Sequence, residues 1–94
     1  MNNEQRLKLS EAMQIAELKR SAFLNRVKNG LLPKGDKFGG TTVLYPKSQI
    51  EAVNAARVLG YDDSKIRDLV VKLREKHMQE AERLIKSQGL EVLR

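Results

Sequence analysis

The chain has 94 residues, a formal net charge of +6 and no cysteine. This length fits a single domain, and the lack of cysteine excludes a disulfide framework and any thiolate-ligated metal site. No apolar run approaches the roughly 20 residues that a membrane-spanning helix needs, and the sequence starts too polar for a signal peptide. We therefore expect a soluble, cytoplasmic protein.

The excess positive charge is concentrated in the first half of the chain. Residues 1–50 hold nine Lys and Arg against four Asp and Glu, whereas residues 51–94 hold nine against eight. A one-sided basic surface is typical of nucleic-acid-binding proteins. Surface charge that serves only solubility would give the same totals, so the motifs must distinguish between these two interpretations.

Residues 12–30 predict two short helices joined by a tight turn. Ser10 is a good N-cap for a first helix over about 11–16, and the second is expected over about 20–28. On that second helix Phe23 and Val27 share one face, which leaves the polar side chains on the other. This is the pattern of a helix-turn-helix, whose second helix lies in the DNA major groove.

The flanking segments complete the expected domain. Residues 1–8 form a polar lead, in which Leu7–Leu9 is compatible with a very short strand. Residues 31–45 predict a two-stranded hairpin, or wing, around a tight turn at Gly39-Gly40. Pro46 suits the first turn of a third helix that ends near Gly60.

A last helix is expected from about Ser64 to Ser87, capped by Asp62 or Asp63. Its length of roughly 36 Å exceeds what one small domain needs. The part beyond residue 70 either braces the domain or pairs with a second copy, and we favour a homodimer, weak or assisted by DNA. The predicted dimer residues are Leu73, His77, Ala81, Leu84 and Ile85.

The residues expected to contact DNA lie on the second helix and in the wing. Arg and Asn side chains read guanine and adenine bidentately, whereas Lys is more often a phosphate contact. Core packing is the alternative for Tyr45, and packing over the core is the alternative for Arg26. The predicted DNA-binding residues are Lys19, Arg20, Ser21, Asn25, Arg26, Lys28, Lys34, Lys37, Thr41, Thr42 and Tyr45.

No catalytic motif emerges from the sequence. His77 has no neighbouring Cys, so a metal site there would need several ligands from elsewhere, and the adjacent Asp62 and Asp63 diverge on a helix. Gly39-Gly40 lacks the strand, further glycine and helix of a dinucleotide-binding loop. We therefore expect a protein that is not an enzyme and that uses no cofactor and no metal.

The order of these motifs resembles the winged helix-turn-helix of the MerR family over residues 9–70. The resemblance is carried by Gly30-Leu31-Leu32-Pro33, by Val43-Leu44-Tyr45 followed by Ile50, and by Leu59-Gly60-Tyr61 followed by Ile66 and Leu69. The first part is also similar to AlpA and phage excisionase proteins. The resemblance implies a mainly α winged helix-turn-helix with a long C-terminal helix, residues 71–94 forming its extension, which pairs antiparallel with a second copy.

The sequence departs from the family pattern at three positions. Glu17 stands at a turn position often held by Gly, and Lys19 stands at the cap of the second helix, where Ser or Thr is common. The wing arginine of these families falls at Thr41 or Val43, so Lys37 is the expected substitute.

We therefore predict a sequence-specific double-stranded-DNA-binding protein, a small MerR-like transcriptional regulator without a ligand-sensing domain. One alternative is an excisionase-like architectural protein of phage or plasmid recombination, packaging or partition, whose long helix docks a protein partner. Another is an interaction adaptor whose basic face meets an acidic partner.

Overall fold

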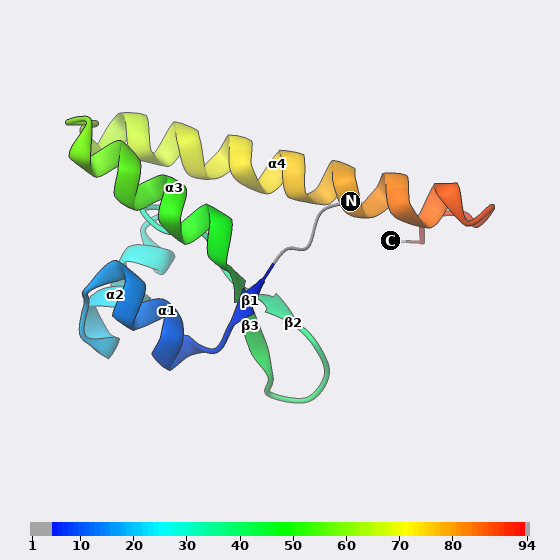
Figure 1. Ribbon diagram of the computed structural model, residues 1–94, viewed down its shortest axis with the longest axis horizontal. Helices are drawn as coiled ribbons and strands as arrows, with labels where there is room; N and C mark the ends of the chain where they lie inside the picture. Colours follow the sequence, from blue (N-terminus) through cyan, green and yellow to red (C-terminus); the bar gives the residue numbers. More distant parts are fainter. Residues whose placement is uncertain (1–4, 94) are drawn as a thin grey trace.

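The computed structural model describes residues 5–93 (Figure 1). This part of the chain is mainly helical and carries a small three-stranded antiparallel sheet. Its elements are β1 (Arg6–Leu7), α1 (Leu9–Ala16), α2 (Arg20–Lys28), β2 (Asp36–Lys37), β3 (Val43–Pro46), α3 (Lys47–Val58) and α4 (Asp63–Ser87). Figure 1 shows α4 along the long axis of the molecule, and α3 packs between α1 and α4.

The sheet has the order β1-β3-β2, with β3 in the centre. Leu7 pairs with Tyr45 on one side of β3, and Asp36 pairs with Leu44 on the other. The expected two-stranded wing is thus joined by a third strand. That strand comes from the expected polar lead over 1–8, of which residues 1–4 lie outside the described residues. Leu7 is only 3% exposed, because pairing with β3 turns its side chain into the core.

The predicted helix boundaries agree with the structure, with one exception at the start of α1. The predicted bounds of α2 are confirmed, and Asp62 caps α4 by accepting a hydrogen bond from Lys65 N at 2.9 Å. The predicted start of α1 is wrong, because this helix begins at Leu9 directly after β1. Ser10 therefore lies inside α1, and the carboxylate of Glu11 instead accepts a hydrogen bond from Lys8 N at 2.9 Å.

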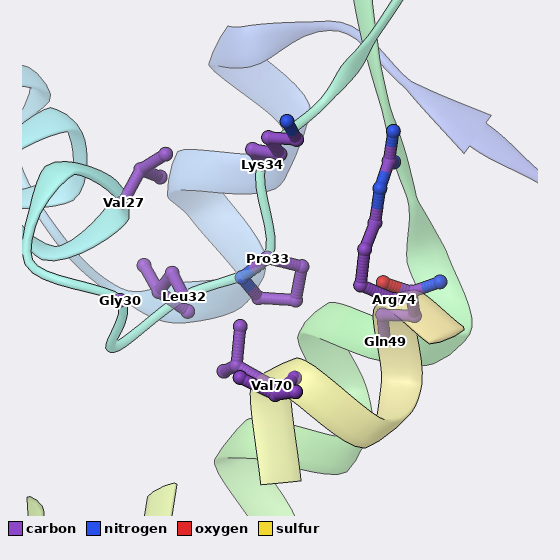
Figure 2. Close-up of a pocket in the computed structure, with 9 residues that line it drawn as sticks. Val27, Gly30, Leu32, Pro33, Lys34, Gln49, Val70 and Arg74 are labelled. Atoms are coloured by element: carbon purple, nitrogen blue, oxygen red, sulfur yellow. The ribbon is translucent and has the colours of Figure 1, made fainter. Parts of the chain in front are cut away.

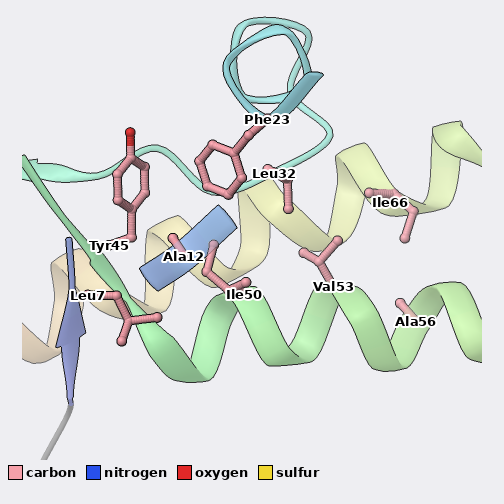
Figure 3. Packing of buried hydrophobic residues seen from close by; sticks show 9 residues of the cluster. All are labelled: Leu7, Ala12, Phe23, Leu32, Tyr45, Ile50, Val53, Ala56 and Ile66. Atoms are coloured by element: carbon pink, nitrogen blue, oxygen red, sulfur yellow. The ribbon is translucent and has the colours of Figure 1, made fainter. Parts of the chain in front are cut away.

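The core lies where α1, α2, α3, β3 and the start of α4 meet (Figure 3). Phe23, Ile50 and Ile66 are fully buried. The ring of Phe23 stands edge-on to the ring of Tyr45, with 5.3 Å between the centroids. This contact joins α2 to β3, so the second helix and the wing are held by one cluster. The buried apolar residues are Leu7, Ala12, Phe23, Leu32, Tyr45, Ile50, Val53, Ala56 and Ile66.

The turn between α1 and α2 is closed by Glu17, which has a left-handed backbone with φ 55° and ψ 42°. Leu18 N donates to the carbonyl of Met13 at 3.1 Å across this turn. Among the described residues, Glu17 is the non-glycine residue with a positive φ. A residue with a Cβ is unfavourable in this conformation, which explains why Gly is often found at such a position.

Glu17→Gly is expected to make the protein more stable than Glu17→Ala by about 0.5–1 kcal/mol, since Gly removes the Cβ strain but gains freedom in the unfolded chain. Glu17→Ala is the matched control, because it loses the carboxylate and keeps the Cβ. Urea unfolding measures the difference. Equal midpoints for the two variants would contradict strain at this turn.

Candidate nucleic-acid interface

The outward face of α2 is largely polar, with Leu24 (38% exposed) among its polar side chains. Ser21, Asn25 and Lys28 are exposed, whereas Phe23 and Val27 on the opposite face pack into the core. The packing of Phe23 therefore decides which side chains of α2 point to solvent. The exposed side chains of this face offer hydrogen-bond donors, hydrogen-bond acceptors and positive charge.

The start of α2 adds two exposed cations, Lys19 and Arg20. Lys19 occupies the N-cap position but makes no side-chain capping bond, because a lysine offers donors only. The first backbone N–H groups of α2 thus lack the side-chain acceptor that Ser or Thr normally supplies. A helix terminus of this kind favours an anion.

Tyr45 lies in the core, so its ring is not part of the exposed surface of the wing. It is 6% exposed and packs against Phe23. Burial raises the pKa of Tyr45 above its ordinary 10.0, and the positive charge of Arg20 offsets part of that rise. Figure 3 shows the hydroxyl pointing away from the other labelled core side chains.

The wing places its polar residues on an exposed tip. Thr42 N donates to the carbonyl of Gly39 at 3.0 Å, and Phe38 N donates to the carbonyl of Thr42 at 3.0 Å, which closes the turn. Lys37, Thr41 and Thr42 are exposed. Phe38 is 49% exposed, and the guanidinium carbon of Arg6 on β1 lies 5.0 Å from the centroid of its ring.

Glycine at position 35 allows the chain to enter the wing close to β3. A Cβ on Gly35 would lie 2.9 Å from the carbonyl oxygen of Leu44, closer than real contacts allow. Lys34, the residue before it, is exposed. The Lys residues at 34 and 37 therefore flank a segment whose path is fixed by backbone packing.

A carboxylate that sequence reasoning missed ties the wing to α4. Asp36 on β2 accepts a hydrogen bond from Arg74 Nη1 at 2.6 Å, and its second oxygen lies 2.6 Å from His77 Nε2. Burial acts to raise the pKa of Asp36, but the hydrogen bonds and charges of Arg74 and His77 outweigh it, so this pKa is held below its ordinary 3.8. About 40 residues separate Asp36 from Arg74 and His77 in the sequence, so no local sequence pattern predicts this cluster.

The structure divides the predicted dimer residues into two groups. Leu73 packs against the core and His77 pairs with Asp36, so both already make contacts within the chain's own fold. Ala81, Leu84 and Ile85 lie farther along α4 and are exposed. His77 lies in the largely polar stretch 75–80 of α4, and its pairing with Asp36 ties that stretch to the wing.

Arg26 differs from the other predicted DNA contacts because it is half-buried. It lies on the flank of α2 next to α3, where it lines a hollow of about 420 Å³ together with Arg57. Its side chain therefore leaves the face formed by Ser21, Asn25 and Lys28.

A second cavity, of about 240 Å³, lies where the end of α2 and the loop after it meet α4 (Figure 2). Val27, Pro33 and Val70 form its apolar walls, and Lys34 and Arg74 lie at its rim. Nearby, Arg67 Nε donates to the carbonyl of Asn29 at 3.0 Å. These contacts hold α4 against the end of α2 while leaving the polar face of α2 uncovered.

Comparison with protein-family models, curated proteins and solved structures gives no match. In the part of the chain that the structure describes, no helix is long and apolar enough to cross a membrane. No group of three His, Asp or Glu side chains within residues 5–93 is placed to hold a metal ion.

The tie between wing and α4 is expected to weaken in acid. Because the folded pKa of Asp36 is depressed, its contribution to stability is present above its ordinary pKa of 3.8 and is lost as the pH falls through the lower folded value. Asp36→Asn should therefore lower the urea midpoint at neutral pH, and the difference from wild type should shrink at the acid end.

The matched control is Asp68→Asn, which removes an exposed carboxylate from α4. It is expected to change the midpoint much less than Asp36→Asn at neutral pH. A difference for Asp36→Asn that stays constant from neutral to acid pH would contradict the charged tie.

Proposed function

We propose that this protein binds double-stranded DNA as a small, MerR-like winged helix-turn-helix regulator, with α2 in the major groove and the wing on the flanking backbone. The observation that carries the proposal is the exposed, largely polar face of α2, on which Ser21, Asn25 and Lys28 are exposed while Phe23 anchors the opposite side. A major groove admits one α-helix, and such a face supplies base-edge donors and acceptors.

The wing is joined to α2 through the core. The Phe23–Tyr45 contact links α2 to β3, the central strand of the sheet. The exposed wing residues Lys37, Thr41 and Thr42 therefore belong to a hairpin that is packed against α2. A helix in one groove with a hairpin beside it can engage bases and neighbouring phosphates together.

The uncapped start of α2 also suits a phosphate. Lys19 supplies positive charge at a helix terminus whose N–H groups have no side-chain acceptor. A phosphate oxygen there would accept those N–H groups and interact favourably with the helix dipole. In this role the ammonium group of Lys19 and the first N–H groups of α2 would contact the same phosphate.

Arg20→Ala is expected to weaken binding to the preferred sequence by about 1–3 kcal/mol and to relax its preference at one base pair. The preferred sequence comes from selection on a random duplex library. Fluorescence anisotropy with selected and scrambled duplexes measures the loss.

Arg20→Lys is the matched variant, since it keeps the charge and loses the bidentate geometry. It should bind scrambled duplexes as wild type does while losing preference for the selected one. An equal loss on both duplexes would place Arg20 on the phosphates.

Lys37→Ala is expected to weaken binding to every duplex alike and to reduce the slope of log affinity against log salt by about one, because one phosphate contact is lost. Lys86→Ala, an exposed lysine near the end of α4, is the control and should leave the slope unchanged. Wild-type binding without any salt dependence, or no binding to duplex DNA at all, would overturn the proposed function.

A further inference from the structure

The cavity between the end of α2 and α4 has apolar walls that come from three parts of the chain. It has a volume of about 240 Å³, and its apolar lining is Val27 of α2, Leu32 and Pro33 of the following loop, and Val70 and Val71 of α4 (Figure 2). An apolar cavity of about 150 Å³ can hold a molecule as large as benzene. This cavity therefore has room for one ring and a substituent.

One polar side chain, that of Gln49 on α3, forms part of the same wall. Gln49 is only 6% exposed, and its side-chain amide makes no hydrogen bond with any other residue that the structure describes. An amide that is removed from water without a partner costs free energy, so buried amides in folded proteins normally have one. Because Gln49 lines the cavity, a molecule bound there can supply the partner.

The charged groups at the rim indicate the charge of that molecule. Lys34 and Arg74 both line the cavity, so a cationic ligand would be repelled. Arg74 Nη1 already donates to the carboxylate of Asp36 at 2.6 Å, and that carboxylate would repel a ligand anion. Lys34 is exposed, and an ion pair with a solvated lysine contributes little. A neutral ligand avoids all three penalties.

We propose that this cavity binds a small neutral molecule that has one apolar ring and one hydroxyl group. The ring would lie against Val27, Pro33 and Val70, and the hydroxyl would form a hydrogen bond with the amide of Gln49. A hydroxyl suits an amide because it can donate to the amide oxygen or accept from the amide nitrogen. The site goes beyond DNA binding and does not depend on it, since Val27 belongs to the core side of α2.

Phenol is the probe for this site, and toluene is the matched compound, because the two have the same size and differ in the hydroxyl. Each is titrated into the isotope-labelled full chain without DNA, and the amide chemical shifts are followed. Phenol is expected to give saturable shifts at the residues that line the cavity. The ratio of the two dissociation constants is the quantity to compare between variants, because the different hydration of the two compounds then cancels.

Gln49→Leu removes the amide and keeps a side chain of similar size. It is expected to shift the ratio of the phenol and toluene dissociation constants by at least about threefold in favour of toluene, because only phenol loses a hydrogen bond. Its urea midpoint without ligand should be equal to or above that of wild type, since an unpartnered amide is removed. Gln79→Leu, the same change at an exposed position of α4, should leave the ratio unchanged.

A second variant tests the place of binding independently of the amide. Val71 is 55% exposed and lines the cavity, so Val71→Phe extends a ring into its open side. This variant is expected to weaken the binding of both compounds by at least about tenfold, because the ring occupies their space. Leu84→Phe places the same ring at an exposed position farther along α4 and should bind both as wild type does. Urea midpoints establish that each variant is folded.

Three results would overturn the proposal. The absence of saturable shifts with phenol at millimolar concentrations would show that the cavity takes no such ligand. A ratio that Gln49→Leu leaves unchanged would show that the amide does not recognise the hydroxyl. Tighter binding of benzoate than of phenol would assign the cavity to an anion held by Lys34 and Arg74.

Discussion

The buried contact between Phe23 and Tyr45 fixes the arrangement on which the rest of the molecule depends. Phe23 is fully buried, and Tyr45 meets it edge-on from β3. Because Phe23 turns one face of α2 inward, the opposite face of that helix must present its polar side chains to solvent. The same contact attaches the wing to α2. Loss of this packing would release the second helix and the wing together.

Asp36 provides the second constraint, since it links the wing to the middle of α4. Its two carboxylate oxygens meet Arg74 and His77 from successive turns of that helix. A strand of two residues has few hydrogen bonds of its own, so this tie contributes much of its attachment. The position of the wing thus depends on the position of α4. The long helix belongs to the domain as far as His77.

Beyond His77, α4 leaves the domain and exposes Leu84 and Ile85. A helix of this length cannot bury its distal apolar side chains against a domain that ends at its middle. The apolar side chains of α4 that pack against the core end at Leu73, one turn before His77.

The helices, the residues at which they end and the turn of the wing depend on local interactions, so the sequence by itself determined them. Phe23 and Val27 at i and i+4, the cap at Asp62 and the glycines at 30 and 60 act within one or two helical turns. Tertiary structure alone decided the pairing of Leu7 with Tyr45, the tie of Asp36 to His77 and the hollow shared by Arg26 and Arg57. Each of these joins residues about 30 or more positions apart, and the free energy that selects such contacts comes from packing and desolvation, which a local pattern does not encode.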